Sequence, residues 1–258
     1  MSSVFPVSAL GREGAGGLSA TDPRLRIVTA AIFAVICVSL TSLIALLLAL
    51  AGAVALAAGF NLPAGPTARR MAAMDGFILF LLISLPFTVP GAPLFTLWGL
   101  TASLEGLTLA MQIALKSNAV ILSVMALVGT VSPVTLGSAL HALHVPGALV
   151  HLLLFTTRYI GVLQDEYARL RLAMRARAFR PANTLHTYRS FGYLVGMMLI
   201  RALDRSDRIM EAMKCRGFDG RLHVMARFRL AYADWIFVGV IGLGLLALIG
   251  VEWWLRAA

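Results

Sequence analysis

Long apolar runs are the feature that most restricts what this chain can fold into. The first extends from Ile27 to about Leu62 without a charged residue, and others cover 73–88, 105–131, 145–161 and 230–255. About 20 apolar helical residues cross the ~30 Å hydrocarbon core of a bilayer. Only 13% of the residues are charged, about half the share of soluble domains. The sequence predicts an all-α polytopic membrane protein with about five to six transmembrane helices.

The apolar runs and their breaks predict the organisation of the chain. The first run is too long for one crossing, so we expect two helices with a tight turn near 40–43. Ser132-Pro133 is typical of a helix start, and Pro146-Gly147 indicates a further break, so we expect a re-entrant or interfacial element within 132–161. The predicted parts are a flexible tail (1–21), N-terminal transmembrane helices (22–161), a cytoplasmic region (162–229) and a C-terminal transmembrane helix (230–258).

A basic heptapeptide occurs twice in the predicted cytoplasmic region. AMRARAF at 173–179 returns thirty-nine positions later as AMKCRGF at 212–218, and the match extends upstream, where Asp165 and Arg169 align with Asp204 and Arg208. A duplicated element usually has a duplicated role.

Each copy is predicted to form an amphipathic helix. In the first copy, Leu163, Tyr167, Leu170 and Met174 form an apolar stripe. The second runs from about Ala202 to Arg216. We expect side-chain pairs at i, i+4 between Asp165 and Arg169 and between Asp204 and Arg208. Pro181 prevents the first helix from continuing, and the segment 185–203 between the copies is expected along the membrane surface.

The two helix ends share further features. Gly217 suits the left-handed residue that ends the second helix. Met174 and Met213 lie on the apolar stripes, and Arg177 and Arg216 continue these stripes into the last turn. A cation at a helix C-terminus is favourable by itself, but that does not account for a duplicated context. A planar guanidinium suits insertion into an acidic groove of another protein.

The positive charge is concentrated in one segment. Residues 158–229 hold 15 of the 22 lysines and arginines but only 6 of the 12 acidic residues. The positive-inside rule places such a segment in the cytoplasm. The same rule places the N-terminus and 62–72 inside and 88–104 outside. Lys116 lies deep in an apolar run, where snorkelling or a misplaced boundary would be needed.

Catalysis and cofactor binding have little support. The sequence lacks a phosphate-binding G-x4-G-K-[ST] loop, a G-x-S-x-G elbow and an H-E-x-x-H zinc motif. His141, His144 and His151 have no acidic or cysteine companions nearby, so we expect helix packing rather than metal ligation. We therefore expect neither an enzyme nor a bound cofactor or metal. The positive-inside rule already accounts for the basic segment, so single-stranded nucleic acid is not an expected partner.

These residues together resemble a known family. The chain is similar to the transmembrane T component of energy-coupling-factor transporters, most closely the cobalt-transport component CbiQ. The resemblance covers most of the chain from residue 22. It is carried by five motifs: Asp22-Pro23-Arg24, Thr130-Val131-Ser132-Pro133, Arg158-Tyr159-Ile160 followed by Glu166, Ala176-Arg177-Ala178 and Cys215-Arg216-Gly217. The last two are the most specific, although Ala178 stands where glycine is common.

The resemblance implies a function. In that family two X-Arg-X motifs end two cytoplasmic coupling helices, and each docks onto one ATPase subunit of an importer. The chain would then lie in the bacterial inner membrane and transmit ATPase movement to a separate substrate-binding S component, for cobalt. A T component for nickel or a vitamin remains open, since the substrate is bound elsewhere. A membrane-anchored protein that binds nucleic acid or lipid through 158–229 also remains open. A stand-alone secondary transporter would need paired acidic residues at mid-membrane, which the sequence lacks.

Overall fold

The computed structural model describes residues 21–90, 93–97, 100–218 and 232–257. The chain forms two compact units, one of Met1–Leu136 with Arg227–Ala258 and one of Gly137–Ala226. The predicted flexible tail, apart from residue 21, lies outside the described residues.

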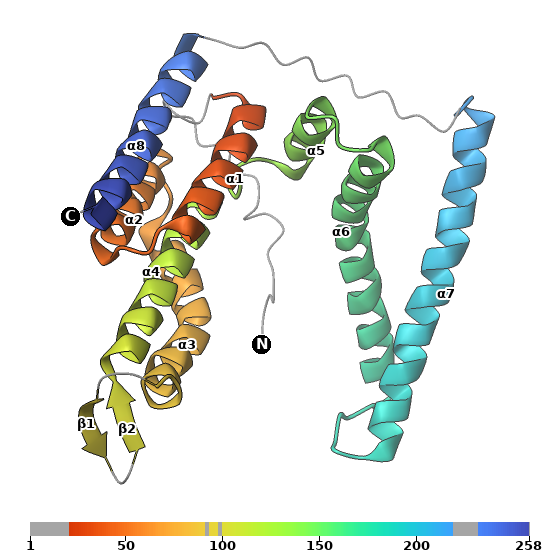
Figure 1. The fold of residues 1–258 in the computed structure, drawn as a ribbon. Coiled ribbons are helices and arrows are strands. Elements are labelled where there is room, and N and C mark those ends of the chain that lie inside the picture. The colour runs from red at the N-terminus through yellow and green to blue at the C-terminus, as the bar shows by residue number, and fades with distance from the viewer. Residues whose placement is uncertain (1–20, 91–92, 98–99, 219–231, 258) are drawn as a thin grey trace. The chain divides into compact units, whose positions relative to one another are not determined.

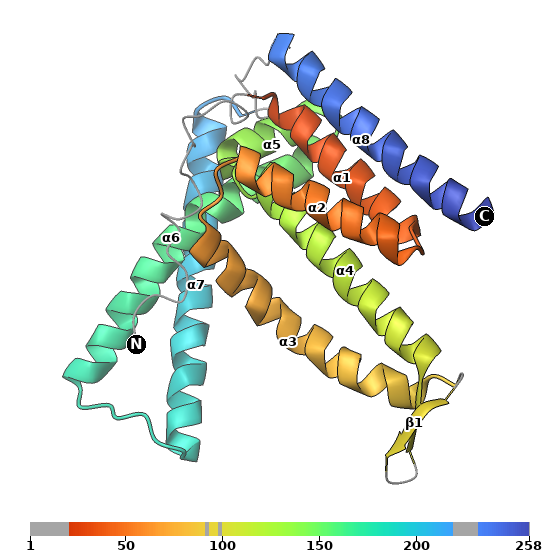
Figure 2. The same ribbon diagram turned by 90° about the vertical axis from the view of Figure 1, so that its left-hand side faces the viewer.

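The first unit is a helical bundle built around α4 (Figure 1; Figure 2). Its helices are α1 (Pro23–Ser39), α2 (Leu43–Gly59), α3 (Ala64–Thr88), α4 (Leu104–Leu127) and α8 (Tyr232–Ala257). The helix α4 contacts α1, α2 and α3, while α8 contacts α1 and α2. Two short antiparallel strands, β1 (Pro93–Leu97) and β2 (Leu100–Ser103), lie between α3 and α4.

The helical membrane fold predicted from the sequence is confirmed. Among the residues that the structure describes, four helices are long and apolar enough to cross a bilayer: 64–88, 104–127, 147–176 and 234–256. The predicted division of the first apolar run is also confirmed, because α1 ends at Ser39 and α2 begins at Leu43. Each of these two helices has 17 residues, about 26 Å at ~1.5 Å per residue.

Small side chains allow α2 to pack closely in this bundle. Four alanines spaced four residues apart in α2 are buried, and α4 contributes the buried Ala119 and Ala126; the α2 residues are Ala45, Ala49, Ala53 and Ala57. Apolar side chains provide little drive for helix association in lipid, where close van der Waals packing of small residues takes over. The alanine stripe therefore explains how so apolar a helix finds a defined partner.

Polar side chains of α4 and α8 form hydrogen bonds with the backbone of the turn between α1 and α2. The Glu252 carboxylate accepts hydrogen bonds from the Thr41 amide (2.9 Å), the Thr41 hydroxyl (2.7 Å) and the Ser42 amide (3.1 Å). The Lys116 ammonium donates to the Val38 carbonyl at 2.9 Å. Lys116 therefore binds the C-terminal end of α1, a contact that the sequence did not predict.

The second unit contains two long helices. It includes most of α5 (Pro133–Ala142), with α6 (Gly147–Ala176) and α7 (Leu185–Cys215). The predicted helix start at Ser132-Pro133 is confirmed, and Ser132 Oγ accepts from the Thr135 amide at 3.2 Å. The break at Pro146-Gly147 is confirmed as well, since α6 begins there.

Two predictions about this unit are wrong. A separate apolar helix over 145–161 and an amphipathic one over 162–178 were expected, but α6 is continuous across this boundary. Likewise, α7 joins the apolar segment 185–203 to the second repeat. No proline interrupts either helix, and a change from apolar to charged composition does not end a helix. The segment 132–161 consists of α5 and the first half of α6, and its re-entrant or interfacial placement stays a prediction.

The Glu252 contacts generate a stability prediction. Glu252→Ala leaves two amides and a hydroxyl of the α1–α2 turn without their acceptor. Because hydrogen bonds to charged groups contribute about 1.5–3 kcal/mol each, we expect a loss of at least ~3 kcal/mol, seen as a lower Tm of the purified protein in detergent. Glu105→Ala is the matched control, since it removes an exposed carboxylate in the first turn of α4, where the helix dipole contributes about 0.3–1 kcal/mol. Equal Tm changes would contradict the assignment.

Candidate functional site: two arginine-bearing helix ends

The two copies of the repeat end their helices in the same way. In α6, the Phe179 amide donates to the Met174 carbonyl (3.1 Å) and the Ala178 amide donates to the Arg175 carbonyl (3.0 Å). In α7, the Phe218 amide donates to Met213 (3.0 Å) and Gly217 donates to Lys214 (3.0 Å). Both are Schellman motifs, in which the residue after the C-cap is left-handed.

This geometry explains the structural role of the residues that the two heptapeptides share. Arg177 and Arg216 are the C-cap residues. Ala178 has φ +57° and Gly217 has φ +78°, so the predicted left-handed role of Gly217 is confirmed. Met and Phe occupy the two positions that commonly contact each other across this motif. The repeat is therefore a helix-ending motif that holds an arginine at a fixed position.

Both arginines are available to a partner. The side chains of Arg177 and Arg216 are exposed, and neither guanidinium has a hydrogen-bond or ion-pair partner among the residues that the structure describes. The flanking residues of the two motifs, Ala176, Ala178, Cys215 and Gly217, are exposed too.

The arginines lie at opposite ends of one helical hairpin. Helices α6 and α7 run in opposite directions and contact each other (Figure 1; Figure 2). Arg177 follows the end of α6 near the start of α7, whereas Arg216 follows the far end of α7. The 31 residues of α7 extend over about 46 Å. The hairpin thus presents two equivalent contact points a long helix apart.

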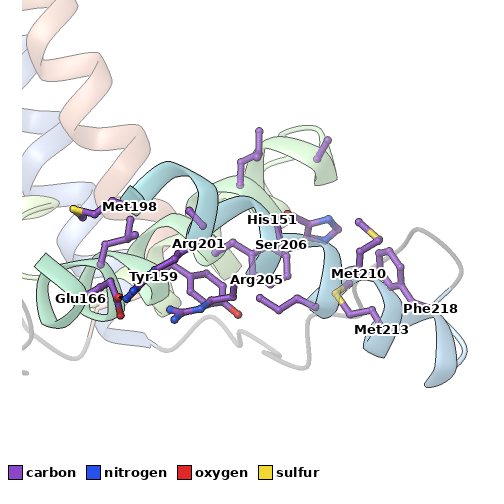
Figure 3. Close-up of a pocket in the computed structure, with 16 residues that line it drawn as sticks. His151, Tyr159, Glu166, Met198, Arg201, Arg205, Ser206, Met210, Met213 and Phe218 are labelled. Carbon is purple, nitrogen blue, oxygen red and sulfur yellow. Dashed lines mark hydrogen bonds and ion pairs between the residues drawn. The ribbon is translucent and has the colours of Figure 1, made fainter. Parts of the chain in front are cut away.

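A groove of about 580 Å³ lies between α6 and α7 on the side of Arg216. Its walls are mostly apolar and include Phe155, Tyr159, Met198, Met210 and Phe218. Figure 3 shows Glu166 and Arg201 directed toward each other at one end of the groove, with Met210, Met213 and Phe218 at the other. In Figure 1, α7 diverges from α6 toward its own C-terminus.

The structure assigns ion pairs that the sequence did not predict. The Glu166 carboxylate binds Arg201 of α7 and also Arg169, at 3.1 Å. The expected pair between Asp165 and Arg169 is therefore wrong, because Glu166 and not Asp165 lies on the buried side of α6. The sequence carried one signal for this cluster: Arg201 follows a run of eleven residues without charge (190–200), and such an isolated charge requires a partner.

The second expected side-chain pair does not form either. The Nε of Arg208 donates to the backbone carbonyl of Asp204 at 3.2 Å rather than to its carboxylate. Of the other predicted residues, Met174 is half-buried on α6, and Met213 lines the groove.

Histidines do not gather into a metal site in the described part of the chain. His141 lies in α5, His144 in the following turn with φ +63°, and His151 in α6 at the groove. No group of three His, Cys, Asp or Glu side chains that could hold a metal ion occurs among the described residues.

The left-handed residue of each motif generates a prediction. Holding an alanine in the left-handed conformation costs about 1–2 kcal/mol of folding free energy relative to glycine. Part of this cost is offset because alanine gives the unfolded chain less conformational entropy than glycine does. Ala178→Gly should therefore stabilise the protein by about 0.5–1 kcal/mol, and Gly217→Ala should destabilise it by a similar amount. No atom lies within 4 Å of a Cβ added at Gly217, so steric clash would not contribute to the second effect. Thermal unfolding in detergent measures both, and changes of the same sign would contradict the motif.

Comparison with known proteins points to one family. The model of the CbiQ family, described as cobalt transport protein, matches residues 17–225. A cobalt transport protein CbiQ of Rhodobacter capsulatus is 30% identical over 129 residues, which cover 47% of this chain and 52% of that protein. A cobalt transport protein CbiQ of Salmonella typhimurium is 26% identical over 163 residues, covering 60% of this chain and 72% of its own length.

A third relative carries no functional description. An uncharacterized protein of Methanocaldococcus jannaschii is 31% identical over 83 residues, covering 32% of this chain and 31% of its own. The chain thus spans about a third to a half of the length of this relative and the Rhodobacter protein. The family match, by contrast, extends from before α1 to beyond α7 and includes both arginine-bearing helix ends. This chain therefore belongs to the CbiQ cobalt transport protein family.

Proposed function

We propose that this chain is the transmembrane coupling subunit of an ATP-driven importer of the energy-coupling-factor type. In this role Ala176-Arg177-Ala178 and Cys215-Arg216-Gly217 each dock onto one ATPase subunit. The chain itself does not catalyse a reaction. It passes the movement of the ATPases to a separate substrate-binding membrane subunit.

One observation supports this proposal above the others. The two helix ends have the same hydrogen-bond pattern, the same C-cap arginine and the same exposure, and they lie at opposite ends of one hairpin. A single chain that faces two ATPase copies needs two equivalent contacts, separated far enough for each to reach its own copy. A generic basic surface would not require identical backbone geometry around each arginine.

The chemistry of the arginines fits this role. A guanidinium offers a planar, always-charged fork that binds carboxylates with two parallel hydrogen bonds. Placing it at a C-cap fixes its position relative to the helix axis, so that movement of a partner is transferred to the whole helix. Helices of 30 and 31 residues extend such a displacement over more than 40 Å.

Cobalt is the proposed cargo. The family description and the names of the Rhodobacter and Salmonella relatives both refer to cobalt transport. The cargo would be bound by the substrate-binding subunit, so this chain needs no metal ligands of its own. The proposed location is the bacterial inner membrane, with residues 164–229 in the cytoplasm, on the basis of the arginine and lysine distribution.

Substitution of the two arginines tests the docking role. If each guanidinium occupies an acidic groove, truncating one side of such a pair costs about 2–5 kcal/mol, which is ~30- to several-thousand-fold in affinity. Arg177→Ala and Arg216→Ala should each weaken recovery of the ATPases with the tagged chain and reduce cobalt uptake, and the double variant should release the ATPases. Lysine at either position should also weaken binding, because the bidentate geometry is lost.

Arg175→Ala and Lys214→Ala are the matched controls. They remove a charge from the last turn of the same helices, at exposed positions one turn before the left-handed residue. We expect small effects at both. If all four alanine variants lose a small and equal share of ATPase recovery, the repeat is only a basic surface. A steep salt dependence of lipid or RNA binding by the chain would then favour the alternative of a membrane-anchored protein that binds lipid or nucleic acid.

Cysteine labelling in intact cells tests the orientation. A membrane-impermeant thiol reagent should modify a cysteine introduced at Thr96, in the segment expected outside. It should not modify one at Asn183, nor the native Cys215, which is exposed in the structure, until the cells are permeabilised. Cys37 is buried and should stay unmodified. Labelling of position 183 from outside would refute the cytoplasmic placement of the hairpin.

A further inference from the structure

A buried carboxylate joins α6 to α7. Glu166 is 7% exposed, and its two oxygens bind different arginines, Arg201 on α7 and Arg169 one turn along α6. In the described part of the second unit, the Glu166–Arg201 contact is the only ion pair between two helices. A buried carboxylate with both oxygens satisfied has a fixed geometry.

Beside this ion pair, α6 and α7 are separated by the mostly apolar groove. From Met198 to Met213 one face of α7 lines the groove, and it faces the Ala148–Glu166 part of α6 across that space. Met198, Met210 and Met213 contribute unbranched, adaptable side chains to the walls. These contacts can rearrange with little cost, whereas displacing Arg201 leaves one oxygen of the buried Glu166 carboxylate without its partner and Arg169 as the remaining ion pair.

The pair also divides the hairpin into two arms. Glu166 lies 11 residues before Arg177 on α6, and Arg201 lies 15 residues before Arg216 on α7, which correspond to about 16 Å and 22 Å of helix. Each arm therefore ends at one of the two arginine-bearing helix ends. A rotation of one arm relative to the other would have the Glu166–Arg201 contact as its fixed point within the helical part of the hairpin.

We propose that the Glu166–Arg201 pair is the pivot of the hairpin: it sets the crossing of α6 and α7 and transmits movement of one arginine-bearing end to the other. Glu166 and Arg201 are positioning residues in this role. They act through the helices rather than by contact with an ATPase or with cargo. This inference rests on the proposed coupling function.

The test uses the complete transporter, with its ATPase and substrate-binding subunits, reconstituted in liposomes. Cobalt uptake and ATP hydrolysis are measured on the same preparation. In Glu166→Gln the ATPases should still be recovered with the chain, because both arginine-bearing ends are intact. Uptake per ATP hydrolysed should fall by about tenfold, since the buried charge that holds the half-exposed Arg201 is removed. Glu211→Gln is the matched control: the same change at an exposed position of α7 should leave uptake per ATP unchanged.

An exchanged pair separates positioning from a general loss of stability. Glu166→Arg combined with Arg201→Glu, in an Arg169→Gln background that removes the like charge beside position 166, restores opposite charges across the crossing, and it should recover uptake per ATP relative to Glu166→Arg or Arg201→Glu in the same background. If Glu166→Gln couples as well as the wild type, or if the exchange recovers nothing, the pivot is refuted. Where a single variant fails to assemble, the exchange alone decides: restored assembly and uptake support the pivot, and continued failure refutes it.

Failure of the pivot is distinguishable from failure of the proposed function. If the wild-type chain recovers no ATPase subunits, the coupling function is wrong, and the pivot is refuted with it. If the wild-type complex forms and transports cobalt while Glu166→Gln matches it, the coupling function stands and only the pivot is refuted.

Discussion

The hydrogen bonding of helix ends is the constraint on which most of this structure depends. An α-helix leaves four amides and four carbonyls unsatisfied at its ends, and the cost of leaving them so rises in apolar surroundings. At the α1–α2 turn, Glu252 accepts from two amides and Lys116 donates to a carbonyl. At the ends of α6 and α7, the chain satisfies its own carbonyls through two Schellman motifs. The first solution holds a bundle together, and the second leaves an arginine free for a partner.

The two units differ in how their helices are held. In the first unit small residues allow close contact, as in the alanine stripe of α2, and polar groups complete the helix ends. In the second unit few side chains are buried, and a single ion pair joins α6 to α7 while a groove separates much of their length. A densely packed unit suits a fixed membrane scaffold, and a sparsely packed hairpin suits an element that rotates in the coupling role proposed here.

The repeat has one physical explanation at each level. Locally, A-M-[RK]-x-R-x-F is a helix C-terminal motif. The Phe amide donates to the Met carbonyl, and the residue after the arginine is left-handed. In the hairpin, antiparallel helices place the two copies at opposite ends. In the proposed complex, this separation lets one chain contact two ATPases. Capping explains the shape of each copy, and two-fold docking explains why there are two.

The sequence by itself determined the membrane class, the helical fold, the division at 40–43, the helix start at Pro133, the break at Pro146-Gly147 and the left-handed Gly217. These follow from apolar run length and from local backbone rules, which act over a few residues. Only the tertiary structure decided that α6 and α7 are continuous, that Glu166 rather than Asp165 binds Arg169, and that Lys116 binds the end of α1. These features depend on which side of a helix meets another helix. Residues far apart in the chain, such as Glu166 and Arg201, become partners only when packing brings them together, and one sequence does not contain that information.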